Sequence, residues 1–365
     1  MRFFHSAPSL VDVGVTNRCN LKCDYCSVSS SPNELKEDEL SLQDFKNLFQ
    51  DLSDMNIHRI SLTGGEPFVR EDFFEILNLT QKHRFAKVIN SNGVLITDSI
   101  ARKLSEFNFD RICITMDGSS PSIHDVIRGD GNFKKTIKGI KSLMRYNLPV
   151  STLFTLNKTN VHDLIPTIKL NEMLGIRYMS VMVVCPTGRA SDGNILADKD
   201  KWYPVFLKLS EMRKNGDIRL NFKIVPPNES SVFWLFYFPL EYYNRLDLLE
   251  VWGQNPRITQ AREVSCTAGI SSCSIAHNGD VYGCELMTGI NELKAGSIKE
   301  NSIKDIWENS FAFLKLREIT FDKITGKCKS CPHKWCGGGC RSASFNLTGS
   351  KYGSDESCFF EERIS

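Results

Sequence analysis

The chain has 365 residues, of which 41% are hydrophobic and 24% charged, and its formal net charge is +2. A chain of this length can bury a large core in one large domain or two. A charge so close to neutral argues against a dedicated binder of nucleic acid or of a membrane surface, because phosphate binding needs an excess of Lys and Arg.

Export is not indicated. Residues 1–30 contain no basic segment followed by a long apolar stretch, so we expect no signal peptide. The longest apolar run, 232–240, is far shorter than the ~20 residues that cross a bilayer. In a chain that stays inside the cell, thirteen cysteines are better explained as metal ligands than as disulfides. We therefore expect a soluble cytoplasmic metalloprotein.

Strand-like and helix-like segments alternate through the first two thirds of the chain. The predicted strands are 10–16, 59–63, 87–90, 111–116, 150–156 and 178–184, and the predicted helices are 42–55, 72–83, 98–107, 133–146, 164–174 and 202–212. Ser41 is a candidate N-cap of the first helix. Six βα units indicate an α/β fold with a parallel sheet. Because six units are too few for a closed eight-fold barrel, we predict a partial (β/α)6 TIM-type barrel.

The last third of the chain has a different texture. From about residue 264 cysteines become dense and glycines cluster, while helical periodicity persists at 303–317. This is typical of a small domain that metal holds together. The predicted division is a barrel at 8–215, an aromatic-rich bridging region at 216–263 and a small cysteine-rich domain at 264–365. We interpret the aromatics as core or interface in preference to a substrate cradle.

Three cysteines, Cys19, Cys23 and Cys26, follow the first predicted strand with no fourth cysteine or histidine nearby. Structural zinc needs four closed ligands, whereas three thiolates can hold a four-iron cluster with one iron open to a cofactor. Their spacing, together with the aromatic Tyr25, resembles the cluster loop of the radical S-adenosylmethionine (SAM) superfamily. A zinc knuckle or inert thiols are the alternative.

The resemblance covers about residues 8–215 and extends to Gly64-Gly65-Glu66-Pro67, after the second strand. It implies that Glu66 binds the amino group of SAM, and the two glycines allow a close backbone approach. It also implies that Tyr25 packs toward the adenine. Alone, such a Gly-Gly-Glu is a common turn, but after a three-cysteine loop it is specific.

Polar residues after the later strands extend the resemblance. It implies contacts to the ribose and methionine parts of SAM from Ser91, Asn92, Thr115 and Asp117, a contact of Arg128 with the SAM carboxylate, and a further contact from Asn157. Ordinary turns are the alternative for Asn92-Gly93 and Asp117-Gly118, and a surface arginine is the alternative for Arg128.

The eight cysteines of the last third resemble the SPASM domain, an extension of radical SAM enzymes that carries two auxiliary four-iron clusters. The resemblance gives the first auxiliary cluster Cys266, Cys273, Cys284 and Cys340, and the second Cys328, Cys331, Cys336 and Cys358, for three [4Fe–4S] clusters in all. Cys331 and Cys336 are one residue closer than is usual, and only some relatives carry Cys273. Without Cys273 the first auxiliary cluster has an open site or a smaller core. Four-cysteine zinc sites are the alternative.

Two cysteines remain. We expect Cys113, inside a predicted strand, to be a small core residue. Cys185 follows the sixth strand at the rim where a substrate would lie, and it is a candidate hydrogen-atom donor, as in peptide epimerases of this superfamily. A structural role is the alternative for Cys185.

The resemblance implies that the enzyme cleaves SAM reductively to a 5′-deoxyadenosyl radical, which abstracts a hydrogen atom from a substrate. The electron donor would be of the flavodoxin or ferredoxin type. We expect a ribosomal peptide or protein as substrate, bound with a separate recognition protein or with none, and modified by cross-linking, thioether formation, epimerisation or oxidation. An enzyme of haem or other cofactor biosynthesis is the alternative within the same class of function. From another class of function, the alternative is an iron–sulfur electron carrier or sensor.

Overall fold

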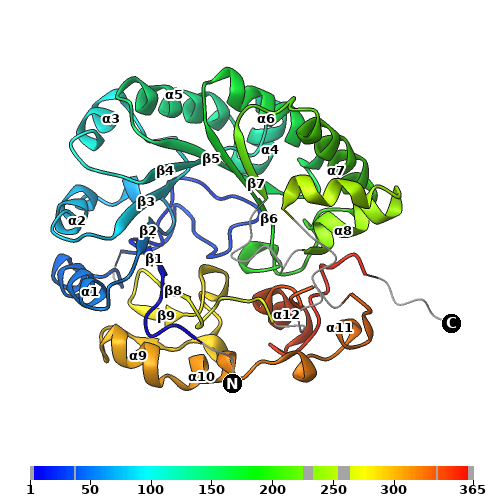
Figure 1. Cartoon of the computed structure of the whole chain (residues 1–365). Coiled ribbons are helices and arrows are strands. Elements are labelled where there is room, and N and C mark those ends of the chain that lie inside the picture. Colours follow the sequence, from blue (N-terminus) through cyan, green and yellow to red (C-terminus); the bar gives the residue numbers. More distant parts are fainter. Residues whose placement is uncertain (1–3, 37, 225–232, 254–263, 334–335, 361–365) are drawn as a thin grey trace.

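The structure is a computed structural model that describes residues 4–36, 38–224, 233–253, 264–333 and 336–360 (Figure 1). Its strands are β1 (Leu10–Gly14), β2 (Arg59–Thr63), β3 (Ala86–Ser91), β4 (Arg111–Thr115), β5 (Val150–Leu156), β6 (Tyr178–Val183), β7 (Asn221–Ile224), β8 (Ser272–Ile275), β9 (Asp280–Tyr282) and β10 (Gly296–Ser297). Its helices are α1 (Leu42–Asp54), α2 (Phe73–Thr80), α3 (Asp98–Leu104), α4 (Pro121–Arg128), α5 (Asn132–Arg145), α6 (Leu164–Met173), α7 (Lys199–Lys214), α8 (Phe233–Tyr242), α9 (Ile303–Asn309), α10 (Phe311–Arg317), α11 (Lys327–Ser330) and α12 (Arg341–Thr348).

One sheet organises the chain, with its strands in the order β10-β9-β8-β1-β2-β3-β4-β5-β6-β7. Strands β1 to β7 are parallel to their neighbours, and helices connect each to the next. Figure 1 shows these helices on the outside of a curved row of strands. The sheet begins at β10 and ends at β7, so it is an open row and not a closed ring. The six predicted strands and the partial barrel are confirmed, and β7 adds a seventh parallel strand.

The two faces of the sheet differ in polarity because side chains alternate along each strand. Val11 and Val13 of β1 are completely buried in the core between the sheet and its helices, so Asp12 between them faces the inner side. Asp12 is paired in register with Ser61. Cys113 is half-buried and also lies on the inner face, between the core residues at 112 and 114. The prediction of Cys113 as a core residue is therefore wrong.

The cysteine-rich tail continues the sheet. Strand β8 pairs parallel with β1, so the sheet crosses the predicted boundary at residue 264. Trp307 and Phe313 of the tail belong to the same hydrophobic core as β1 to β4. Phe359 packs against Trp234 of α8 with ring centroids 4.5 Å apart, beside the second core under β5 to β7. The tail therefore packs against both halves of the barrel.

Local signals explain most of the helix ends. Ser41 caps α1 as predicted, because its hydroxyl accepts the N–H of Asp44 in a capping box. The single helix predicted at 303–317 is wrong, since the backbone at Ser310 is extended (ψ 129°) and separates α9 from α10. Four aromatics of α8, Phe233, Trp234, Phe236 and Tyr237, are buried in the second core, as we expected, whereas Tyr242 is 71% exposed. Residues 225–232 and 254–263 of the bridging region lie outside the described residues.

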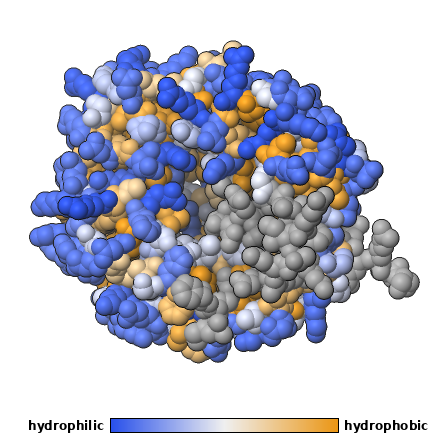
Figure 2. All heavy atoms as spheres, viewed as in Figure 1, coloured by the Kyte–Doolittle hydropathy of each residue, from blue (hydrophilic) through white to orange (hydrophobic). Residues whose placement is uncertain are grey.

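The outer helices carry most of the hydrophilic surface on the face shown in Figure 2. Within the described ranges, no helix combines the length and the apolar character that a membrane span requires.

Candidate active site

The first three cysteines lie in the loop that follows β1, where the parallel strands end. Cys19 and Cys23 are each 8% exposed, and the thiols of Cys19, Cys23 and Cys26 interact electrostatically with one another. Burial raises the pKa of Cys19 to about 12, and the backbone N–H of Leu21 donates to its sulfur over 3.4 Å. Three neighbouring thiols with an N–H directed at one sulfur form a donor set that fits an iron–sulfur cluster.

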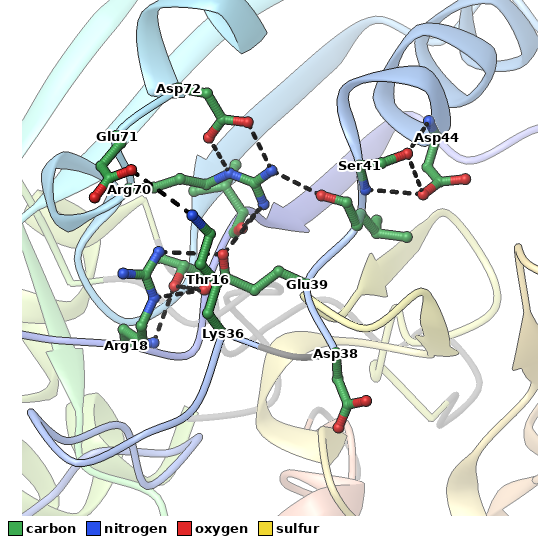
Figure 3. A network of polar contacts seen from close by, with 12 residues as sticks. Thr16, Arg18, Lys36, Asp38, Glu39, Ser41, Asp44, Arg70, Glu71 and Asp72 are labelled. Atoms are coloured by element: carbon green, nitrogen blue, oxygen red, sulfur yellow. Dashed lines mark hydrogen bonds and ion pairs between the residues drawn. The ribbon is translucent and has the colours of Figure 1, made fainter.

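A buried ionic network holds the base of this loop (Figure 3). Arg18 donates to both carboxylate oxygens of Glu39, at 2.9 and 3.2 Å. Arg70 lies 3.6 Å from the same carboxylate and donates to the carbonyls of Val15 and Leu40, each over 2.7 Å. The residues before and after the cysteine loop are thereby fixed together. Our sequence analysis did not single out this network, because Arg and Glu at these spacings resemble surface residues.

The two glycines after β2 fit against the backbone that leads into the cysteine loop. The N–H of Gly65 donates to the carbonyl of Thr16 over 2.7 Å, and the N–H of Glu66 donates to the carbonyl of Arg18 over 2.9 Å. A Cβ atom at Gly64 would lie 2.2 Å from the Thr16 oxygen, and one at Gly65 would lie 2.1 Å from the Arg18 oxygen. Glycine is therefore required at both positions because two loops of the chain touch there. The sequence analysis attributed these two glycines to the close approach of a ligand instead.

Glu66 is completely buried beside this contact. Its Oε1 accepts the Ser91 hydroxyl over 2.8 Å and the N–H of Phe68 over 3.3 Å, and its Oε2 accepts the N–H of Asn92 over 2.8 Å. These donors are neutral, and burial raises the pKa of Glu66 to about 7. An ammonium group beside it would stabilise the carboxylate, so this environment fits the amino group of SAM.

Asn92 connects the end of β3 to the cysteine loop. Its Nδ2 donates to Asn20 Oδ1 over 2.8 Å and lies 3.8 Å from the sulfur of Cys19. Its Oδ1 accepts the N–H of Val94 over 2.9 Å, and Gly93 has a φ of 76°. Asn92 therefore takes part in an ordinary Asx-type turn and in the contact with the cysteine loop at the same time.

Asp117 and Arg128 are buried and form one group with the half-buried Tyr25 at the ends of β1 and β4. Arg128 is ion-paired with Asp117 and hydrogen-bonded to the hydroxyl of Tyr25, which also donates to Asp117. The other oxygen of Asp117 accepts the N–H of Thr155 over 2.8 Å. The sequence analysis gave these three side chains separate contacts with SAM, whereas the structure joins them to one another.

His124 was missed by the sequence analysis. It is completely buried on α4, and its Nδ1 accepts the N–H of Asp117 over 3.2 Å. Burial lowers the pKa of His124 to about 4, so the ring is neutral. Its Nε2 is buried without a hydrogen-bond partner among the described residues. The sequence alone cannot reveal that a neutral histidine positions Asp117 in this way.

Thr115 and Asn157 complete the predicted set. Thr115 is half-buried at the last position of β4. Asn157 is completely buried after β5, where its Nδ2 donates to the Thr155 carbonyl over 3.0 Å and its Oδ1 accepts the N–H of Thr159 over 2.9 Å. These contacts are local, so Asn157 shapes its own turn.

The structure brings together the four cysteines that were predicted for the second auxiliary cluster. They line one recess, whose walls are Phe233, Trp234, Tyr237, Phe238, Lys327, Cys328, Cys331, His333, Cys336, Cys358 and Phe360. Four thiols and an apolar aromatic wall form a donor set that fits an iron–sulfur cluster. Across the described ranges, no three His, Cys, Asp or Glu side chains are close enough together to hold a single metal ion.

The four cysteines predicted for the first auxiliary cluster do not all meet. Cys284 interacts electrostatically with Cys266 and Cys340. Cys273 is completely buried in the hydrophobic core of β8, where Asp12 is the charged group that acts on it. The Cys185 thiol, from the segment after β6, is hydrogen-bonded to Cys340.

Two known families match parts of this chain. The radical SAM superfamily matches residues 13–170, and the SPASM iron–sulfur cluster-binding domain matches residues 266–332. An AdoMet-dependent heme synthase from Methanosarcina barkeri is 27% identical over 362 residues, which cover 97% of each chain. The mycofactocin maturase MftC from Mycobacterium tuberculosis is 27% identical over 341 residues, which cover 93% of this chain and 80% of the maturase.

A solved structure shares the fold. SuiB from Streptococcus suis, bound to S-adenosylmethionine, superposes with a TM-score of 0.75 at 19% identity, over 97% of this chain and 78% of SuiB. The two matched domains imply SAM and iron–sulfur clusters as cofactors. The chain is a radical SAM enzyme with a C-terminal SPASM iron–sulfur domain.

Proposed function

We propose that the enzyme modifies a ribosomally made peptide or protein, by cross-linking, thioether formation, epimerisation or oxidation. When bound, a reduced four-iron cluster and SAM supply a radical that removes a hydrogen atom from the substrate. The part of the protein is to hold both cofactors, to orient the substrate and to exclude water.

Glu66 carries the SAM-binding proposal. Its buried carboxyl lies between the ends of β2 and β3, next to the cysteine loop, and would receive the SAM amino group. Ser91 and Asn92 hold the carboxyl in place through the hydrogen bonds described above. Arg128 would offer a guanidinium to the SAM carboxylate while Asp117 keeps it oriented. Tyr25 would pack toward the adenine, with Thr115 as the remaining polar contact.

Three [4Fe–4S] clusters follow from the cysteine groups. Cys19, Cys23 and Cys26 would hold the first and leave one iron for SAM. The lining of the tail recess supplies four thiols for a second cluster, and the group around Cys284 supplies three for another. A flavodoxin or ferredoxin would deliver the electron.

The single observation that favours a peptide over an anionic substrate is a pair of acids on the inner face of the barrel. Burial raises the pKa of Asp12 to about 6, and burial together with Asp12 raises the pKa of Glu285 to about 7. The hydroxyl of Thr63 donates to Glu285 over 3.4 Å, which places this pair at the carboxyl end of β2. Above about pH 7, where both carboxyls are ionised, acids at this position would repel the carboxylates of a tetrapyrrole, and they suit a neutral or cationic peptide.

Haem biosynthesis is the second candidate, and three of the relatives favour it. Three AdoMet-dependent heme synthases are 27–28% identical to this chain over 96–97% of its length. MftC and SuiB support the peptide proposal, since the first is named a maturase and the second has been solved with its precursor peptide SuiA.

The test is a co-expression experiment. The enzyme is produced with each short peptide encoded beside its gene, and the peptides are analysed by mass spectrometry. In parallel, the purified enzyme receives dithionite, SAM and a porphyrin that carries propionate groups. We expect a mass change in a peptide that depends on Cys19, Cys23 and Cys26, and no release of carbon dioxide from the porphyrin. Porphyrin decarboxylation with unmodified peptides would establish the second candidate instead.

A further inference from the structure

Cys185 lies two positions after the last residue of β6, on the rim of the barrel that faces the tail. Its thiol is hydrogen-bonded to that of Cys340, and Cys284 also acts on it electrostatically. Cys284 in turn interacts with Cys266 and Cys340.

Two packing contacts hold these segments together: the Ser342 hydroxyl donates to the carbonyl of Leu286 over 2.5 Å, and a Cβ atom at Gly283 would lie 2.7 Å from that of Ala268. Three thiols of the tail and one of the barrel are therefore neighbours at this joint.

Cys273 lies elsewhere. It stands opposite Val11 in the register between β8 and β1, and its side chain is completely buried. Val11 and Ile275, its neighbours on that side of the sheet, are fully buried core residues. The charged group that acts on Cys273 is Asp12. To reach Cys284, the side chain of Cys273 would have to leave the hydrophobic core.

We propose that Cys185, and not Cys273, is the fourth ligand of the first auxiliary iron–sulfur cluster. This assignment rests on the proposed function only in that the tail binds iron–sulfur clusters. Four thiolates complete a closed cluster, and each thiol releases its proton when the metal binds. The barrel then contributes a ligand to a cluster whose other three ligands are in the tail.

The surroundings of Cys185 hold it in place. Arg189, four residues later, donates its Nε to the carbonyl of Cys23 over 2.7 Å and its backbone N–H to the carbonyl of Cys26 over 3.1 Å. A Cβ atom at Gly188 would lie 2.2 Å from the same Cys26 oxygen, so this segment packs tightly against the first cysteine loop. On the tail side, the N–H of Cys340 donates to Asp355 over 2.8 Å. Cys185 is thus fixed between the two cluster regions.

The test uses the full chain with Cys19, Cys23 and Cys26 replaced by Ala, so that the tail holds all remaining iron. Into this background go Cys185→Ala, Cys185→Ser and, as the matched control, Cys273→Ala. Each variant is reconstituted anaerobically, and its iron, its sulfide and its EPR spectra in the oxidised and in the reduced state are measured, with circular dichroism as the test of folding. None of these measurements depends on a substrate or on turnover.

We expect the parent and Cys273→Ala to bind about eight irons per chain, with closed four-iron clusters that are EPR-silent when oxidised. In Cys185→Ala one cluster should lose its fourth iron in part and give a three-iron signal, or be lost with about four irons. The milder Cys185→Ser should shift the reduced spectrum of one cluster while the protein stays folded. Unchanged iron and spectra in both Cys185 variants, as a hydrogen-atom donor would give, would overturn the assignment, and so would cluster loss in Cys273→Ala.

A failure of the three-cluster proposal is distinguishable from a failure of this assignment. Zinc in place of iron in the parent variant would refute both the iron–sulfur tail and the ligand role proposed for Cys185. A parent with about eight irons and unaltered Cys185 variants would refute the ligand role alone.

Discussion

Asn92 and Glu66 meet where two parallel strands end, and the backbone N–H of Asn92 donates to Oε2 of Glu66 over 2.8 Å. The side chain of Asn92 points the other way and reaches Asn20 in the cysteine loop over 2.8 Å. One residue therefore sets the distance between the acid and the thiols. A ligand bound through its ammonium to Glu66 would be presented to a metal centre on that loop.

Replacing Glu66 by Gln should weaken SAM binding about 10- to 100-fold, because a charge-assisted hydrogen bond contributes about 1.5–3 kcal/mol. The carboxyl has a pKa of about 7, so in the unmodified enzyme the affinity for SAM should rise as the pH rises through 7. Anaerobic equilibrium dialysis between pH 6 and pH 8 measures both effects. Glu75→Gln, on an exposed position of α2, is the control. An affinity that Glu66→Gln leaves unchanged would remove Glu66 from the site.

The same carboxyl should make the stability of the cofactor-free protein depend on pH. The usual pKa of 4.5 is raised to about 7 in the folded protein, so below pH 4.5 the group is protonated in both states. Between pH 4.5 and pH 7, Glu66 is largely ionised in the unfolded chain but protonated in the folded protein, so stability falls as the pH rises. The free energy of unfolding should fall by roughly 3 kcal/mol, and the fall should be complete above pH 7. Urea unfolding under reducing conditions should show it, and Glu66→Gln should reduce the slope.

Gly65→Ala should displace the cysteine loop. The added methyl would lie 2.1 Å from the backbone oxygen of Arg18, which cannot rotate away as a side chain would. We expect the variant to lose the cluster of the first loop, about four irons per chain. Gly216→Ala is the control, because its Cβ meets nothing within 4 Å and only its φ of 75° is unfavourable. Equal iron contents in the two variants would show that the contact at Gly65 is dispensable.

Arg70→Met tests the network beneath the loop. Arg70 is buried, and its loss leaves Glu39 with one cationic partner fewer and two carbonyl groups without their donor. The free energy of unfolding should fall by about 3–5 kcal/mol. Arg145→Met removes an exposed ion pair with Asp98 and should cost less than about 1 kcal/mol. Similar losses in the two variants would mean that the buried network adds little.

Replacing Cys19, Cys23 and Cys26 together by Ala should abolish SAM cleavage and leave about two thirds of the iron, because the auxiliary clusters have ligands of their own. Iron analysis beside an assay for 5′-deoxyadenosine measures this. Loss of iron from every site would contradict independent clusters.

The strands of the barrel could be predicted because each is a short apolar segment followed by Gly, Asn or Asp. Strand β7 (Asn221–Ile224) was missed although its positions alternate between exposed and buried, because four residues are too few for this pattern to stand out. Strand β8 was missed for another reason: Ser-Cys-Ser-Ile reads as part of a cysteine-rich domain, and only the tertiary pairing with β1 makes it a strand.

For the site, motif spacing identified Glu66, Asn92 and the first cysteines, because residues at the ends of neighbouring parallel strands meet. It did not identify His124, which acts on Asp117 through the backbone. Nor did it show that Cys185 would meet Cys340, because the two lie 155 positions apart and meet only when the tail folds onto the barrel. Long-range pairs of this kind leave no local pattern.

The most direct test of the account is iron and sulfide analysis after anaerobic reconstitution, together with an assay for 5′-deoxyadenosine in the presence of dithionite and SAM. A radical SAM enzyme with three clusters should bind about twelve irons per chain and form 5′-deoxyadenosine. About four irons with zinc in the tail would contradict the auxiliary clusters, and intact clusters without SAM cleavage would contradict the radical chemistry itself.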